Sequence, residues 1–168
     1  MDEINVIIEA DVNPTESEEK VEKAIEKIFG KIPTQIQSIY KERVGVSTRD
    51  ELLSDKTDFS PSKTKEKGPH AHVASIYRGV KITAQTNSTE PLTSFANLLR
   101  RERIRAAARK ILHEGLKGNT ITFHLNKQVA YAGHISFSEA TAESPLGPIK
   151  VTIKCQNPRK LIEQLTRF

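Results

Sequence analysis

Residues 4–30 read I-N-V-I-I-E-A-D-V-N-P-T-E-S-E-E-K-V-E-K-A-I-E-K-I-F-G and combine two hydrophobic patterns. Residues 4–10 are rich in β-branched side chains, which predicts a buried first strand. A helix follows, because the apolar residues recur at helical spacing and Gly30 is placed to end it. These apolar residues are Val21, Ala24, Ile25 and Ile28. Its start has two candidate caps, Asn13 followed by a proline, or Thr15 in a capping box.

The rest of the chain alternates between strand and helix patterns. The predicted strands lie at 36–46, 73–77, 80–84, 120–125, 132–137 and 149–153, with 73–84 as a hairpin turning at Arg78-Gly79. The predicted helices are 91–114, ending at Gly115, and a short last helix capped by Asn157-Pro158. This order separates helices from strands. It predicts an α+β fold, an antiparallel or mixed sheet with helices packed on one face.

The 168 residues are enough for one domain, so we interpret residues 1–168 as a single α+β domain. Residues 47–72 differ in composition, since few of them are apolar and serine, lysine, glycine and proline fill the middle. Such a stretch buries too little surface to offset the entropy lost on ordering. It is predicted to be a mobile insertion.

The apolar face of the predicted helix at 91–114 changes direction. With about 100° of rotation per residue, Leu92, Phe95 and Leu99 point in one direction from the helix axis. The apolar residues from Ile104 onward point about 120° away from that direction. Either the helix bends near Arg100, or its two halves pack against different elements.

Composition excludes several classes of protein. No run of 18 apolar residues is present, the N-terminus is acidic, and there is one cysteine, Cys155. A membrane span, a signal peptide and a disulfide framework are therefore not expected, and we expect a cytoplasmic protein. The net charge of +5 is unevenly placed, because residues 1–30 hold nine acidic and three basic side chains. The remaining basic excess suits a polyanionic partner.

The most basic segment is R-R-E-R-I-R-A-A-A-R-K at residues 100–110, with six basic residues and one acid. On one continuous helix Arg101, Arg105 and Arg109 would form a ladder about 12 Å long on one face. Arginine binds phosphate through a planar fork, so this ladder is a candidate RNA-contacting surface. The alternative is a solvated helix face.

The tripeptide Asn126-Lys127-Gln128 falls between two predicted strands, at an expected hairpin tip. One ammonium flanked by two amides could contact phosphates or base edges. A plain polar turn explains the same residues. A weaker alternative is the sequence G-H-I-S-F at 133–137, which echoes the end of an RNA-recognition-motif octamer without its leading basic residue and first aromatic.

No catalytic, metal or cofactor site is predicted. The five histidines have no acidic residue at ligand spacing, and nucleotide-binding, nucleophile-elbow and zinc-protease motifs are not found. Cys155 is expected to be a small buried side chain.

Several blocks of this sequence resemble, in order, an archaeal family catalogued as uncharacterised and labelled RNA-binding. The blocks are Asn13-Pro14-Thr15-Glu16, Arg103-Ile104 with Ala108-Arg109, Gly118-Asn119-Thr120-Ile121, Asn126-Lys127-Gln128-Val129-Ala130-Tyr131 and Ser144-Pro145-Leu146-Gly147-Pro148-Ile149. The resemblance covers nearly the whole chain except residues 47–90. This chain departs from the family in that polar stretch and in Arg105-Ala106, where the family prefers an acidic position nearby.

The resemblance implies a fold like that of the 5S rRNA-binding protein of the large ribosomal subunit, a homodimer, and a relation to predicted exosome subunits. Together with the basic segment, it predicts a non-catalytic protein that binds structured or single-stranded RNA. The predicted contacts are Arg100, Arg101, Arg103, Arg105, Arg109 and Lys110, with Asn126, Lys127 and Gln128 as a secondary site. The alternative is a homodimeric structural or adaptor protein of a larger ribonucleoprotein complex, without direct RNA contact.

Overall fold

The structure, a computed structural model, describes residues 3–43, 75–139 and 146–167. The chain divides into two compact units, Met1–Ile39 with Gly79–Phe168, and Tyr40–Arg78. The first unit contains the surfaces considered below. The predicted insertion at 47–72 lies outside the described residues, so the insertion and the single-domain interpretation stay predictions.

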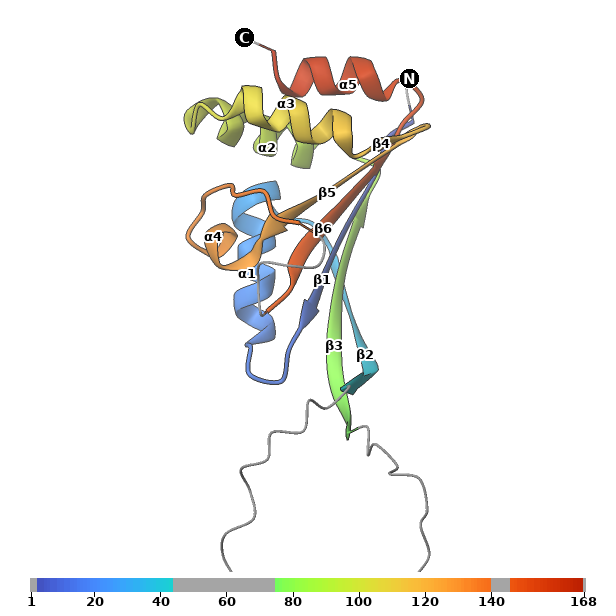
Figure 1. Cartoon of the computed structure of the whole chain (residues 1–168), viewed down its shortest axis with the longest axis vertical. Coiled ribbons are helices and arrows are strands. Elements are labelled where there is room, and N and C mark those ends of the chain that lie inside the picture. The colour runs from blue at the N-terminus through green and yellow to red at the C-terminus, as the bar shows by residue number, and fades with distance from the viewer. Residues whose placement is uncertain (1–2, 44–74, 140–145, 168) are drawn as a thin grey trace, which may run out of the picture. The chain divides into compact units, whose positions relative to one another are not determined.

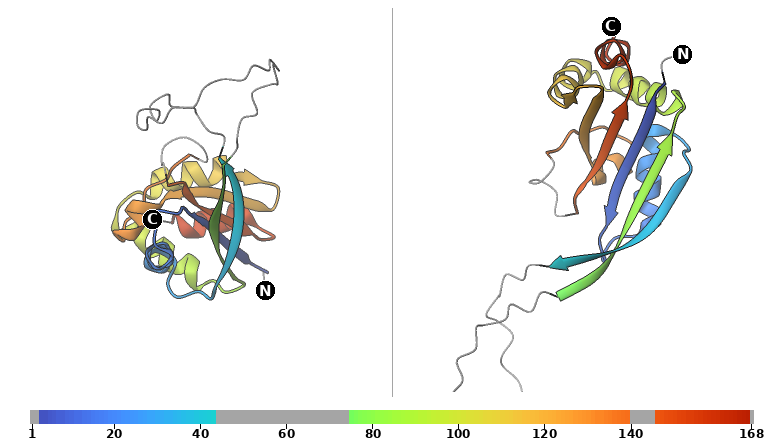
Figure 2. Two further views of the ribbon diagram at one scale, coloured as in Figure 1. Left: turned by 90° about the horizontal axis from the view of Figure 1, so that it is seen from below. Right: turned by 90° about the vertical axis from the view of Figure 1, so that its right-hand side faces the viewer.

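The described chain forms a six-stranded antiparallel sheet and five helices. The strands are β1 (Asn5–Val12), β2 (Thr34–Arg43), β3 (Ser75–Thr86), β4 (Leu116–Lys117), β5 (Thr120–Asn126) and β6 (Pro148–Lys154), in the order β2-β3-β1-β6-β5-β4. The helices are α1 (Glu18–Phe29), α2 (Glu90–Arg101), α3 (Arg105–Glu114), α4 (Lys127–Tyr131) and α5 (Pro158–Leu165). All five lie on one side of the sheet (Figures 1 and 2). The predicted α+β class is confirmed.

Alternation along the strands builds the core between sheet and helices. In β1 every second residue is buried, namely Val6, Ile8, Ala10 and Val12. Aromatic rings continue this layer, since Phe95 of α2 stacks on both Phe29 of α1 and Phe123 of β5 at 5.5 and 5.3 Å between ring centroids. Each such ring contributes roughly 1.5–3 kcal/mol by leaving water. The two helices are thereby fixed over the centre of the sheet.

The opposite face of the sheet carries polar residues. Glu9 of β1 lies opposite both Thr83 of β3 and Lys150 of β6. Its carboxylate is 2.6 Å from the ammonium of Lys81 and 3.7 Å from that of Lys150. This alternation is the period of two expected of a sheet with helices on one side only.

The predicted hairpin at 73–84 is wrong. β3 runs as one strand from Ser75 to Thr86, with no reversal at Arg78-Gly79. The reason is tertiary, because β1 supplies pairing partners for seven successive residues, from Val80 to Thr86. That long partner makes continuation of the strand more favourable than a tight turn.

The predicted hairpin around Asn126-Lys127-Gln128 is also wrong. β5 ends at Asn126, whose side-chain oxygen accepts hydrogen bonds from the backbone N–H of Gln128 and Val129, at 3.0 and 3.1 Å. Asn126 is therefore the N-cap of α4. The strand expected at 132–137 is reduced to a single bridge between Leu125 and Phe137.

The predicted long helix is divided into α2 and α3. Residues 102–104 separate the two helices, and Arg103 has the left-handed φ of 58°. Both alternatives from the sequence contribute, since the break lies just after Arg100 and the halves pack differently. α2 contacts α1 and also α5, whereas α3 contacts α5 and β5. The change in apolar direction is thus explained.

Helix α1 ends at Gly30, which has a φ of 79°, as predicted. Neither Asn13 nor Thr15 is its cap, because Ser17 is the N-cap residue. The backbone N–H of Asn13 instead donates to the Glu16 carboxylate at 2.9 Å. The connection before α1 is therefore a turn of its own.

Candidate nucleic-acid interface

The predicted arginine ladder is not continuous. Arg100 and Arg101 are at the end of α2, Arg103 is in the break, and Arg105 and Arg109 belong to α3, followed by Lys110. A residue with positive φ interrupts the helical ladder, so the i, i+4, i+8 geometry does not extend from Arg101 to Arg109. The basic residues are instead spread over two helix segments.

These arginines lie along the protein surface. A guanidinium N–H of Arg101 donates to the carbonyl of Gly133 at 3.2 Å, and one of Arg105 donates to the carbonyl of Arg167 at 2.9 Å. Arg105 is half-buried, whereas Arg100, Arg101, Arg103, Arg109 and Lys110 are exposed. For Arg101, the bond to the Gly133 carbonyl uses one of the five N–H donors of the guanidinium.

Glu102, the one acid of this segment, is bound to the protein interior. Its carboxylate accepts the backbone N–H of Ile135 at 3.0 Å and lies 3.1 Å from Nδ1 of His134. Only 16% of the Glu102 side chain is exposed. These bonds fix the break between α2 and α3, and Oε1 of Glu102 also lies 3.9 Å from a guanidinium nitrogen of Arg101.

Helix α5 adds basic residues that the sequence analysis did not select. α5 lies beside α3 (Figure 1). A cavity of about 580 Å³ between them is lined by Arg109, Lys160, Glu163, Gln164, Thr166 and Arg167. An adjoining cavity of about 570 Å³ is also lined by Lys160, together with Arg159. Lys160 thus connects two hollows on one basic surface.

A signal for these residues was present in the sequence. Pro158, Leu161, Ile162 and Leu165 are the buried residues of α5, so Arg159 and Lys160 occupy its other side. What the sequence did not show is that Lys160 shares a cavity with Arg109 of α3. We call residues 100–110 and 158–167 together the α3–α5 surface.

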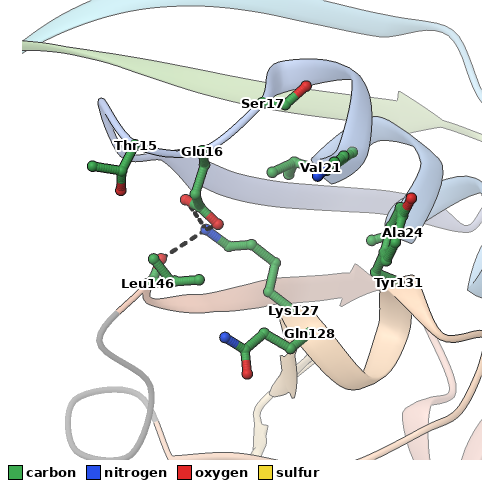
Figure 3. Close-up of a pocket in the computed structure, with 10 residues that line it drawn as sticks. Thr15, Glu16, Ser17, Val21, Ala24, Lys127, Gln128, Tyr131 and Leu146 are labelled. Atoms are coloured by element: carbon green, nitrogen blue, oxygen red, sulfur yellow. Dashed lines mark hydrogen bonds and ion pairs between the residues drawn. The ribbon is translucent and has the colours of Figure 1, made fainter.

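The three residues of the predicted secondary site, Asn126, Lys127 and Gln128, have different environments in the fold. The Lys127 side chain is 3% exposed, and its Nζ donates to the carbonyl of Leu146 at 2.7 Å and to the Glu16 carboxylate at 2.9 Å (Figure 3). It also donates to the carbonyl of Asp11 at 2.5 Å. All three ammonium donors are therefore engaged inside the protein. The hairpin tip on which the predicted phosphate contact depended is absent. We therefore do not include Lys127 among the candidate RNA-contacting residues.

The two neighbours of Lys127 have different places. The side-chain oxygen of Asn126 is used as the cap of α4, whereas Gln128 is exposed. Of the three residues, Gln128 is the most exposed.

Three further features concern the described part of the chain. No group of three or more His, Cys, Asp or Glu side chains that could hold a metal ion is found there. Within the same residues, no helix is long and apolar enough to cross a membrane. Cys155 is buried at 6% exposure, as predicted for a small core residue.

Comparison with known proteins identifies relatives over nearly the whole chain. A UPF0201 protein of Sulfurisphaera tokodaii is 38% identical over 161 residues, covering 96% of this chain and 86% of the relative. One of Sulfolobus acidocaldarius is 35% identical with the same coverage. The crystal structure of the UPF0201 protein from Methanococcus jannaschii has a TM-score of 0.64 and 28% identity, covering 98% of this chain and 93% of the other.

A protein-family model described as RNA binding matches residues 5–155, which includes α3 but ends before α5. The matched range spans every strand of the described sheet. By this match and by its identity to the archaeal relatives, the chain belongs to the UPF0201 family.

Proposed function

We propose that this protein binds RNA through the α3–α5 surface and has no catalytic activity. The observation that carries the proposal is the cavity in which Arg109 of α3 meets Lys160 of α5 and Arg167 just after it. A groove lined by cations from two helices can contact successive phosphates of one strand. The RNA-binding description of the family model supports the same class of partner.

The charge of the α3–α5 surface supports this choice. Its two segments contain nine basic and two acidic residues, a net charge of +7, which exceeds the +5 of the whole chain. One of the two acids, Glu102, is hydrogen-bonded to the backbone of Ile135. The rest of the molecule is therefore acidic on balance, so the field attracts a polyanion to this end of the fold.

The finer features implied by the family resemblance belong to the same proposal. We propose that the RNA is structured or single-stranded and that the protein acts within a larger ribonucleoprotein complex. A fold likeness to the 5S rRNA-binding ribosomal protein and a place in the exosome are consistent with a surface that contacts phosphates. Fold likeness alone is weak support for function, so the basic groove remains the main argument.

A second candidate function is that of a homodimeric adaptor, which one observation favours. β2 is an edge strand of the sheet, and its residues 34–38 carry no charge. Ile36 within it is 51% exposed. Edge strands are usually protected by charged residues or proline, so an uncharged edge can pair with another chain. In this alternative, dimerisation is the function, and the arginines are solvated surface side chains that contact no RNA.

The salt dependence of RNA affinity tests the proposal. In a single-stranded RNA 12-mer titration, log K should fall linearly with log salt concentration, by about 0.7 per phosphate contact. The Arg109→Gln, Lys160→Gln double variant should flatten this slope by about 1.4. A matched control is Lys23→Gln, Lys31→Gln, which removes two exposed charges at α1 and just after it.

The control variant should keep the wild-type slope. Equal slopes for the wild type and the Arg109, Lys160 variant would contradict the proposed surface. A protein that dimerises in light scattering but shows no salt-sensitive RNA binding would support the adaptor function instead.

A further inference from the structure

A separate pocket lies between the β1–α1 connection and α4 (Figure 3). Its volume is about 280 Å³. It is lined by Thr15, Glu16, Ser17, Lys20, Val21, Ala24, Lys127, Gln128, Tyr131 and Leu146. Pockets for drug-sized ligands start at about 300 Å³, so this one suits a smaller, single-ring or two-ring group.

The floor of the pocket is closed by the buried ion pair of Lys127 and Glu16. Since Lys127 donates to Glu16, Asp11 and Leu146, its ammonium has no donor left for a phosphate. Val21 and Ala24 add buried apolar surface from α1. A flat, largely uncharged ligand therefore fits the interior better than a phosphate group.

The rim of the pocket offers an aromatic ring and a free amide. Tyr131 is 40% exposed. The carboxamide of Gln128 makes no hydrogen bond to any residue that the structure describes, and it presents both a donor and an acceptor. Proteins recognise unpaired RNA bases by two such interactions, stacking on an aromatic ring and hydrogen bonding at the base edge.

The tyrosine is held in place by α1. Nζ of Lys27 donates to the carbonyl of Tyr131 at 2.6 Å and lies 4.6 Å from the centroid of its ring. A positioned ring loses less conformational entropy when a base stacks on it. Lys20, which also lines the pocket, supplies a cation for the phosphate next to a bound base.

The pocket adjoins the α3–α5 surface. Arg101 donates to the carbonyl of Gly133, only two residues after Tyr131. Two residues span at most about 7 Å, so the Arg101 guanidinium lies close to the backbone at the end of α4, where Tyr131 lines the pocket. A strand whose phosphates lie on residues 100–110 can therefore place a neighbouring base beside Tyr131.

We propose that this pocket binds one unpaired nucleobase of the RNA, stacked on Tyr131 and recognised at its edge by Gln128. The inference rests on the proposed RNA-binding function and adds base selectivity to it. The α3–α5 surface supplies affinity that is independent of sequence, whereas the pocket distinguishes one base from another.

Binding of RNA 12-mers made of a single base, oligo(A), oligo(C) or oligo(U), tests the inference at fixed salt. The wild type should prefer one of them. Gln128→Ala and Tyr131→Ala should each lower the affinity for the preferred oligomer by about tenfold and remove the preference, because base stacking and edge contacts are lost. The slope against salt should stay unchanged, since no phosphate contact is removed.

Tyr131→Phe is the matched control, because it keeps the ring that stacks, and it should retain most of the affinity. Both altered residues are exposed, so thermal unfolding should stay near the wild type. The result that would contradict base binding in the pocket is salt-sensitive binding of all three oligomers with equal affinity, unaltered in Gln128→Ala and Tyr131→Ala. The proposed RNA-binding surface would still stand.

A direct measurement separates the pocket from the surface. Nucleoside monophosphates titrated into ¹⁵N-labelled protein should shift the side-chain amide signals of Gln128, and these shifts should disappear in Tyr131→Ala. Such shifts in a protein without salt-sensitive RNA binding would support the pocket while contradicting the α3–α5 surface. Unmoved Gln128 signals at saturating concentrations of all four monophosphates would contradict the pocket.

Discussion

Lys127 and Glu16 are 111 residues apart in the chain, and the Nζ of the lysine lies 2.9 Å from Oε2 of the glutamate. Only 3% and 10% of the two side chains are exposed. The lysine also bonds the carbonyls of Asp11 and Leu146. One buried ammonium therefore joins the end of β1, the turn before α1, the start of α4 and the segment leading into β6.

Replacing Lys127 by methionine should destabilise the protein strongly. The change keeps most of the side-chain volume but leaves the Glu16 carboxylate buried without its cation, which costs about 3–5 kcal/mol. Urea unfolding measures the loss. The control Lys20→Met makes the same replacement at an exposed site and should stay within about 0.5 kcal/mol of the wild type. Equal stability of the two variants would show that the ion pair contributes little.

Gly115, at the end of α3, should not tolerate a side chain. A Cβ built there would lie 1.9 Å from the backbone oxygen of Thr122, in β5. Gly115→Ala should cost about 3 kcal/mol, since strand and helix end must move apart. Gly118→Asn is the control, because Gly118 has a φ of 58° with no atom within 4 Å of its Cβ position, and asparagine tolerates that conformation. In chemical denaturation, Gly115→Ala should be clearly less stable than Gly118→Asn.

His124 should make stability depend on pH. Burial, and then the nearby ammonium of Lys150, lower the pKa of His124 below its ordinary value of 6.5. The folded protein therefore takes up a proton less readily than the unfolded chain, so stability should be full above pH 6.5 and fall as the pH decreases toward the folded pKa.

The difference in unfolding free energy between His124→Asn and the wild type, followed from pH 7.5 to 5, isolates this contribution. The variant should lose less stability on acidification than the wild type does. His113→Asn, at an exposed position of α3, should follow the wild-type curve. Parallel curves for His124→Asn and the wild type would contradict the prediction.

Arg103 should be strained by its left-handed backbone. Its φ of 58° costs a residue with a side chain about 1–2 kcal/mol, whereas glycine adopts it freely. Arg103→Gly should therefore be more stable than Arg103→Ala by up to about 1 kcal/mol, in thermal unfolding. Both variants lose the same charge, so their RNA affinities should fall equally. Greater stability of the alanine variant would argue for a continuous helix at this point.

The apolar period of the sequence determined the fold class and most of the elements. The β-branched residues at 4–10 and the helical spacing from Val21 to Ile28 are properties of short windows, so they predict β1 and α1 without knowledge of the rest. The drift of the apolar face at 91–114 likewise indicated a discontinuity, because each half must face its own partner. Burial of Cys155 and the basic excess after residue 30 also follow from composition.

Tertiary structure decided which polar residues meet. Nothing near Lys127 in the chain predicts that its ammonium is buried against Glu16, because the pairing needs β1 and α4 to be brought together. Glu102 likewise finds the backbone of Ile135 only after folding, and this contact accompanies the break that divides the arginine ladder. Arg109 and Lys160 share a groove because α3 and α5 pack side by side. Hydrophobic patterning sets which face of an element is buried, whereas contacts between polar groups depend on where distant elements place them, and that is not a local property of the chain.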